Sequence, residues 1–280
     1  KIFFFFFIPR MKICPFDKHV RKKFSEMFAA IGVIFSIVVA FFPIEQETRT
    51  VAGIVFASVC VVTYIGVWIS AMLSKKVKLR IRNTNVVIQV GDIWEAPGKK
   101  VIPMNEFFDT ENPGFIDENS LHGQFIRKYE GKGEDIYSHI ISTLKSRGIN
   151  GIVMKREQGK PIKFRLGTIC EYDDIFMLAY TSFDKDNRAN LYGDNFPKCY
   201  SNMWNEIDIH NNGESISMPV LGTGKTRFDK DYKPQELLEI MLITLRMSGV
   251  NLERRATLNI VIHKSLAKDI NFIRHKSFSD

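Results

Sequence analysis

Residues 24–42 read FSEMFAAIGVIFSIVVAFF, and residues 51–73 read VAGIVFASVCVVTYIGVWISAML. Each segment has about 20 residues, the length that an α-helix needs to cross about 30 Å of hydrocarbon. Glu26 is the single charged residue of the first segment and lies at its edge, and the second segment carries no charge. Neither segment has a polar face, and a domain of this size has no core large enough to hide both helices, which disfavours a buried hairpin in a soluble protein. The two segments predict a transmembrane hairpin.

The charges that flank the two segments predict which side of the membrane each end faces. Lys and Arg gather without acidic residues at positions 18–23 and 75–82, whereas between the segments Glu45 and Glu47 oppose a single Arg49. Cytoplasmic loops carry the excess of Lys and Arg in membrane proteins. We therefore expect a multi-pass protein whose termini both face the cytoplasm.

The N-terminal segment, residues 1–23, is basic and opens with KIFFFFFIPR at positions 1–10. This apolar run is too short to span a bilayer. Met11 offers a more ordinary start for a membrane protein, so we expect residues 1–10 to be an upstream extension.

Composition disfavours several classes of function. The net charge of +8 comes from 39 basic and 31 acidic residues, and much of the excess flanks the hairpin, so membrane topology explains it better than a nucleic-acid surface. The four cysteines lie far apart without a C-x-x-C pair, and the histidines lack metal-ligand spacing. We expect no nucleic acid, no disulfide framework and no metal site.

Small residues recur along the first span at Ala29, Gly32, Ser36 and Ala40. Steps of three or four residues between small side chains are typical of close contacts between membrane helices. Ordinary packing of the two spans explains this spacing, and self-association in the membrane is a second use of it. We expect the protein to form a homo-oligomer.

Residues 77–280 read as one cytoplasmic α/β domain. Runs rich in Val and Ile predict strands, runs with helical spacing predict helices, and the two kinds alternate. Such alternation predicts a mixed β-sheet sandwiched between helices. We expect strands at 77–82, 86–91, 100–104, 163–171, 175–183, 215–221 and 258–263, and helices at 120–129, 134–146, 200–210, 234–248 and 266–274.

Two loops that follow predicted strands carry residues suited to a nucleotide. Asp92 directly follows a strand, where its carboxylate can accept a hydrogen bond from an amine such as that of adenine; a turn aspartate is the alternative interpretation. Asn105 ends the next strand, where an amide can hydrogen-bond a ribose. The loop at 112–117 contains Gly114, which lets backbone N–H groups approach phosphates, although a solvated connection has the same composition.

The third loop reads PVLGTGKTRF at residues 219–228. Gly222 and Gly224 permit a tight backbone cradle around a diphosphate, with a hydroxyl and two cations nearby. The stretch GKT at 224–226 imitates the end of a P-loop, but the position where that motif needs its first glycine is Pro219, and no helix opens directly after it. A P-loop ATPase is therefore excluded.

Together these stretches resemble the macro domain, a family that binds ADP-ribose and related nucleotides. The resemblance rests on GDI at 91–93, VIPMN at 101–105 and the loop at 219–228, and it covers about 78–275. The chain is most similar to the membrane-anchored macro-domain effectors of Thoeris anti-phage defence systems, in which two membrane helices precede the macro domain. NSLHGQF at 119–125 looks especially like that subgroup.

The resemblance implies a macro-like fold, an ADP-ribose derivative as the ligand, no cofactor and no catalytic residue. It also implies a role for each loop. Asp92 and Ile93 would contact the adenine, and Asn105 would contact the distal ribose. The residues on the first phosphate side would be Gly114, Phe115, Ile116, Asp117 and His122. The residues that hold the diphosphate would be Gly222, Thr223, Gly224, Lys225, Thr226 and Arg227.

The implied function is that of a sensor in the inner membrane of a bacterium. A TIR-domain partner enzyme would make an NAD-derived messenger, the macro-like domain would bind it, and the hairpin would disrupt the lipid bilayer. Hydrolytic macro domains usually carry an N-A-A-N motif and a glycine triplet, where this sequence has Met104-Asn105-Glu106 and a single Gly114. This departure favours a ligand-binding effector over the alternative, a membrane-tethered ADP-ribosyl hydrolase.

Overall fold

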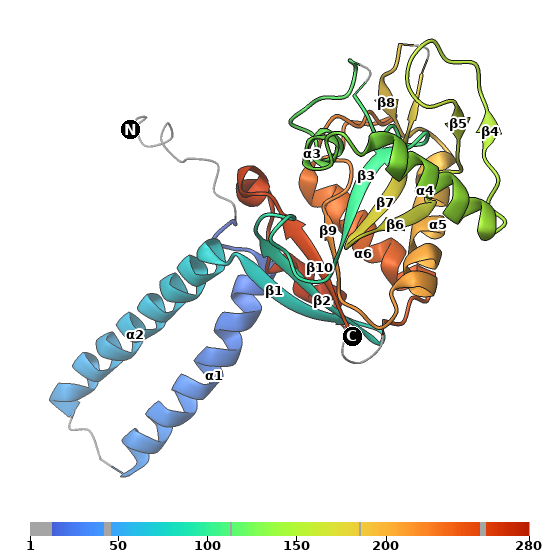
Figure 1. Ribbon diagram of the computed structural model, residues 1–280. Helices are drawn as coiled ribbons and strands as arrows, with labels where there is room; N and C mark the ends of the chain where they lie inside the picture. Colours follow the sequence, from blue (N-terminus) through green and yellow to red (C-terminus); the bar gives the residue numbers. More distant parts are fainter. Residues whose placement is uncertain (1–12, 42–45, 113, 185, 253–255, 280) are drawn as a thin grey trace, which may run out of the picture. The chain divides into compact units, whose positions relative to one another are not determined.

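The computed structural model describes residues 13–41, 46–112, 114–184, 186–252 and 256–279 (Figure 1). The chain divides into two compact units: a helical unit formed by Lys1–Lys75 with Asn271–Arg274, and an α/β unit formed by Lys76–Ile270 with His275–Asp280. The expected extension at 1–10, and part of the expected loop between the spans, lie outside the described residues.

Two long helices, α1 (Lys18–Phe41) and α2 (Gln46–Leu73), form the helical unit and run side by side in Figure 1. Both are long and apolar enough to cross a membrane. Each begins several residues before the predicted span, because the polar residues that precede the apolar run continue the helix. Val33 and Val62 are 60% and 68% exposed, so the chain itself does not cover this apolar surface, and lipid would.

The three glycines of the spans have no close neighbours within the hairpin. A Cβ atom added at Gly32, Gly53 or Gly66 would meet no atom within 4 Å. Aromatic rings fill the contact instead, with the centroids of Phe35 and Phe56 4.5 Å apart. Packing within one hairpin therefore does not explain the glycines.

A small cluster of hydrophobic side chains packs at one end of the hairpin. Tyr64 donates a hydrogen bond from its hydroxyl to the carbonyl of Pro15 (2.7 Å), and the indole N–H of Trp68 donates to the carbonyl of Ile13 (3.1 Å). Ile273, far along the chain, packs against the same cluster. The buried members of the cluster are Ile13, Val20, Val67 and Ala71.

An eight-stranded mixed sheet forms the centre of the α/β unit, in the order β1-β2-β10-β9-β3-β7-β6, with β8 paired to β7. The five strands from β2 to β7 in this order are parallel, and β1, β6 and β8 pair antiparallel with their neighbours. The strands are β1 (Lys76–Ile81), β2 (Thr84–Val90), β3 (Lys99–Asn105), β6 (Ile169–Tyr172), β7 (Ile175–Phe183), β8 (Ala189–Asn190), β9 (Ile216–Pro219) and β10 (Thr257–Ile262).

Helices cover both faces of the sheet, as the sequence predicts. Figure 1 shows α5 and α6 behind the sheet, on the face opposite α4. A separate antiparallel pair, β4 (Ile152–Val153) and β5 (Ile162–Lys163), extends from the connection after α4. The helices are α3 (Leu121–Lys128), α4 (Gly133–Ser146), α5 (Asn195–His210) and α6 (Pro234–Ser248), followed by two 3₁₀ turns, η1 (Lys264–Asp269) and η2 (Arg274–Phe278).

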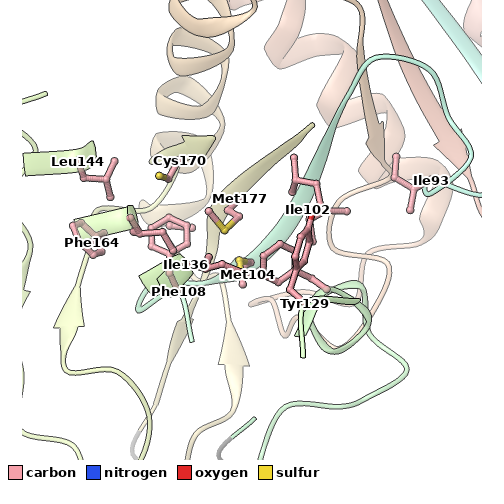
Figure 2. Packing of buried hydrophobic residues seen from close by; sticks show 14 of the residues in the cluster. Ile93, Ile102, Met104, Phe108, Tyr129, Ile136, Leu144, Phe164, Cys170 and Met177 are labelled. Carbon is pink, nitrogen blue, oxygen red and sulfur yellow. The ribbon is translucent and has the colours of Figure 1, made fainter. Parts of the chain in front are cut away.

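The core beneath α3 and α4 is closely packed (Figure 2). Ile102 and Met104 of β3 and Met177 of β7 lie in one cluster with Ile136 of α4 and Phe125 of α3. All five side chains are at most 2% exposed. Burial of one such side chain stabilises the fold by about 1.5–3 kcal/mol, so this cluster holds α3 firmly on the sheet.

Two predicted elements are interrupted. The expected strand at 163–171 is broken, because Gly167 turns the chain with φ +89° and lies so close to α5 that a Cβ atom would fall 2.5 Å from the carbonyl of Cys199. The expected helix at 266–274 is also wrong. The backbone at Ile270 is extended, and the side chain of Asn271 accepts hydrogen bonds from the N–H groups of Ile273 and Arg274.

The sheet opens between β9 and β3. Among the described residues these strands pair only where they begin, at Lys99 with Ile216 and Lys100 with Ser217. A close contact holds this junction, because a Cβ atom at Gly98 would fall 1.9 Å from the carbonyl oxygen of Ser215. The two strands separate beyond it, toward their carboxyl ends.

Gly98→Ala should destabilise the protein by more than the backbone strain of a positive φ alone, because the added Cβ atom would also clash with the carbonyl oxygen of Ser215. The control is Gly148→Ala, because Gly98 and Gly148 have similar φ values, +73° and +72°, but a Cβ atom at position 148 meets nothing within 4 Å. We expect about 1 kcal/mol for the control and at least about 2 kcal/mol for Gly98→Ala in denaturant unfolding. Equal losses would contradict the close contact.

Candidate functional site

A cavity of about 730 Å³ lies at the carboxyl ends of the parallel strands. Its walls come from the loops after β2, β9 and β10, from the connection between β3 and α3, and from the end of β7. Loops from distant parts of the chain meet there because parallel strands place their carboxyl ends at one edge of a sheet. The size suits a nucleotide-sized ligand.

Most of the residues singled out in the sequence line this one cavity. The first two loops contribute several residues, and the third forms a continuous stretch from Pro219 to Arg227. Their shared location supports a common ligand, which remains a prediction. The lining residues among those predicted are Asp92, Ile93, Phe115, Ile116, Asp117, His122, Gly222, Thr223, Gly224, Lys225, Thr226 and Arg227.

Asn105, for which the resemblance implies a ribose contact, lies apart from most of the other predicted residues. Its side chain is 1% exposed and lies outside the cavity lining. The amide nitrogen donates to Oδ2 of Asp109 (2.8 Å), and the amide oxygen accepts from the N–H of Phe107 (3.0 Å). Asn105 therefore holds the backbone of the loop that follows β3 instead of facing a ligand.

Gly114 also lies outside the lining. Its N–H donates to the side chain of Asn112 (2.9 Å) in a local turn, so the glycine shapes the loop, and Phe115 and Ile116 after it line the cavity. Asp92 lines the cavity, and its Oδ1 accepts from the N–H of Trp94 (2.9 Å), as in the turn-aspartate interpretation. Its contact with an adenine stays a prediction.

Several residues that line the cavity were not predicted from the three loops in the sequence. Tyr180, Thr181 and Phe183 come from the end of β7, and Arg188 follows them. Phe183 packs edge-to-face on Phe115, with ring centroids 5.4 Å apart. A strand that ends at the same edge as β3 could have indicated these residues, since the ends of central strands line such sites.

The third loop is tightly folded over an aromatic residue. Gly222 has φ +85°, and a Cβ atom there would lie 2.5 Å from Cζ of Phe228. The hydroxyl of Thr223 donates to the carbonyl of Val220 (2.8 Å). Gly224, in contrast, faces open space within 4 Å, so only the first glycine is required by the fold itself.

One ion pair joins the second loop (112–117) and the third loop (219–228). Nζ of Lys225 lies 3.1 Å from Oδ2 of Asp117, and both residues line the cavity. The N–H of Asn119 and the ammonium of Lys225 lower the pKa of Asp117 below its ordinary value. Arg188 and Arg227 add positive charge to the lining, which therefore suits an anionic ligand.

His122 is neutral in this environment. It is 7% exposed, and Nε2 lies 2.7 Å from the carbonyl oxygen of Asp109. Because a carbonyl only accepts, Nε2 carries the proton and Nδ1 remains an acceptor. Burial lowers the pKa of His122, and its contact with Asp109 only partly offsets this effect.

The described residues contain no group of three or more His, Cys, Asp or Glu side chains placed to hold a metal ion. Burial raises the pKa of the Cys170 thiol to about 12 and the pKa of the Cys199 thiol further still. Neither thiol is a nucleophile at neutral pH, because the thiolate is the reactive form.

Comparison with known proteins agrees with this geometry. A family model described as Thoeris protein ThsA, Macro domain, matches residues 86–263. Thoeris protein ThsA of Bacillus amyloliquefaciens (strain Y2) is 30% identical over 275 residues, which cover 94% of this chain and 90% of that protein.

Among solved structures, a point mutant of the Oceanobacillus iheyensis macrodomain aligns with a TM-score of 0.48 and 13% identity, over 73% of this chain and 96% of that one. The same macrodomain with ADP aligns with a TM-score of 0.46 and 13% identity, over 72% and 94% of the two chains.

The lowered pKa of His122 predicts a pH dependence of stability. The unfolded chain binds a proton near the ordinary pKa of 6.5 whereas the folded chain binds it at lower pH, so the stability falls as the pH drops below about 6.5. The melting temperature of His122→Gln should fall less than that of the parent between about pH 7.5 and about pH 5.5. Equal changes in the two proteins would contradict a buried neutral imidazole.

Proposed function

We propose that this chain, which belongs to the family of the Thoeris ThsA macro domain, is a membrane-anchored anti-phage effector that senses an ADP-ribose-like messenger. The observation that carries the proposal is the convergence of Asp92, the Gly222–Arg227 loop and His122 on one nucleotide-sized cavity. The messenger is derived from NAD by a TIR-domain partner enzyme, as the membership in the Thoeris family suggests.

The charges of the cavity support a nucleotide that contains a diphosphate. Lys225 and Arg227 belong to the glycine-bearing third loop, which can also offer backbone N–H groups to phosphate oxygens. Asp92 lies on the loop after β2, where a carboxylate can accept from an adenine amine. A ligand with phosphates at one end and adenine at the other matches this distribution.

Hydrolysis of ADP-ribosylated substrates finds less support. Asn105 is buried outside the cavity lining, and the two buried thiols are protonated at neutral pH. The cavity offers groups that bind an anion, and a binding protein needs no more. We therefore propose that the α/β unit is a sensor without turnover.

The hairpin supplies the response. Its apolar surface suits a lipid bilayer, and the glycines that face open space leave room for a second copy of the hairpin. The chain passes from Leu266 at the cavity to Ile273 in the helical unit within one short segment. Ligand binding then shifts the hairpins toward an assembled state that permeabilises the bacterial inner membrane, with both termini cytoplasmic.

Gly224→Glu should abolish binding of ADP-ribose, because the new carboxylate enters the diphosphate end of the cavity and repels phosphate. The fold should tolerate the change, since a Cβ atom at this position meets nothing within 4 Å. Calorimetry of the purified full-length protein in detergent measures the binding. Gly131→Glu, outside the cavity lining, is the control, and retained binding by Gly224→Glu would refute the assignment of the loop.

Vesicles that contain the full-length protein and an entrapped dye should release the dye when the product of a TIR-domain NADase acting on NAD is added. Release needs both units, because the ligand binds the α/β unit and the hairpin contacts lipid. Vesicles with Gly224→Glu should stay intact. Release without added product, or from the Gly224→Glu protein, would contradict a ligand-controlled hairpin.

A further inference from the structure

A short antiparallel projection, which we call the finger (residues 151–163, containing β4 and β5), packs along the connection between β3 and α3. We call that connection the β3–α3 loop (residues 106–120). No residue of the finger lines the cavity, whereas the β3–α3 loop supplies one of its walls. Three cations of the finger pair with three acids of the loop: Lys163 with Glu106 (3.0 Å), Arg156 with Asp109 (3.1 Å) and Lys160 with Glu111 (3.3 Å).

The central pair of this series is buried. Asp109 is fully buried, and each of its carboxylate oxygens lies 3.1 Å from a different guanidinium nitrogen of Arg156. The backbone N–H of Lys160 donates to the same carboxylate (2.6 Å), and Arg156 also donates to the carbonyl of Lys160 (2.8 Å). A buried carboxylate needs this number of donors, so the finger and the loop are fixed to each other.

Two contacts lead from this pair to the cavity wall. The backbone carbonyl of Asp109 accepts the hydrogen bond from Nε2 of His122. The guanidinium of Arg156 lies 3.9 Å from the ring centroid of Phe107 and 5.6 Å from that of Phe115. His122 and Phe115 both line the cavity, so one buried ion pair fixes two of its side chains.

The backbone of the finger is shaped for this approach. Gly159 has φ +83°, and a Cβ atom there would fall 2.7 Å from Oδ1 of Asp109 and 2.8 Å from a guanidinium nitrogen of Arg156. Any side chain at this position would push the finger away from the loop. The close approach therefore requires glycine here.

We propose that the finger positions the ligand site and that Arg156 is its positioning residue, holding His122 and Phe115 in place without touching the ligand. The geometry of the cavity wall thus depends on a segment outside it. As far as it concerns the ligand, this inference rests on the proposed binding of an ADP-ribose-like nucleotide.

Arg156→Met tests the proposal, and Arg147→Met is the matched control. Arg147 also pairs with a carboxylate, that of Glu206, and also donates to a backbone carbonyl, that of Ile169 (2.8 Å). It lies outside the cavity lining and does not contact the β3–α3 loop through any interaction among the described residues. Both variants lose an ion pair, but only Arg156→Met removes the support of His122 and Phe115 in the cavity wall.

Calorimetry of the full-length protein with ADP-ribose should show an affinity at least about tenfold weaker for Arg156→Met, because small displacements of positioning groups are costly. Arg147→Met should bind like the parent. Arg156→Lys should recover only part of the loss, since an ammonium cannot make the two parallel bonds. Equal affinities of Arg156→Met and the parent, or equal losses in the two methionine variants, would overturn the proposal.

A second measurement does not depend on the ligand. The ¹⁵N signals of His122 in histidine-labelled protein should report the neutral Nε2–H form in the parent and in Arg147→Met, and should shift in Arg156→Met. An unchanged His122 signal in Arg156→Met would overturn the positioning role. If the parent binds no ADP-ribose while the signal shifts as expected, the proposed function fails and the positioning role stands.

Gly159→Ala provides the same test if Arg156→Met does not fold, because it displaces the finger without removing a charge. Gly148→Ala, at a glycine of similar φ with open surroundings, is its control. Gly159→Ala should weaken ADP-ribose binding and shift the His122 signals, and Gly148→Ala should do neither. A Gly159→Ala protein that behaves like its control would refute the role of the finger.

Discussion

Parallel pairing of β10 with β2 on one side and β9 on the other is the constraint on which the site depends. In this register Val90 lies opposite Ile262, and Pro219 opposite Val261, so the three strands end together. Asp92, Gly222 and Ser265 therefore meet at one cavity although they lie far apart along the chain. The short pairing of β9 with β3 leaves the opposite wall of the cavity to the β3–α3 loop.

The sequence was sufficient for features that depend on local pattern. The apolar runs, the alternation of strands and helices, and the glycine-bearing loop at 219–228 each follow from neighbouring residues, and strand ends indicated where the loops would meet. The role of Asn105 could not be obtained in this way. Its orientation depends on Asp109, whose charge is compensated by Arg156, 47 residues further along the chain, and no local pattern reports that partnership.

The segment after β10 shows the same limit. Its apolar spacing favours a continuous helix at 266–274, but tertiary contacts decide its backbone. Ile273 packs against the cluster that contains Val67 of α2, whereas His275 is fully buried and belongs to the α/β unit. The extended backbone at Ile270 and the hydrogen bonds that Asn271 accepts from the N–H groups of Ile273 and Arg274 separate the two 3₁₀ turns.

The polar groups around the cavity differ in burial, and this difference affects how the site could respond to a ligand. Glu106 and Asp109 are buried and hold the shape of the β3–α3 loop. Lys225 is 75% exposed and forms its ion pair with Asp117 (3.1 Å) at the surface, where water competes with it. One wall is therefore rigid, and the other can exchange its ion pair for a ligand. A ligand shifts a conformational equilibrium only by its difference in affinity for two states. In the proposed function, a nucleotide that engages both the β3–α3 loop and the third loop would favour an arrangement in which Lys225 has left Asp117, and this preference would supply such a difference.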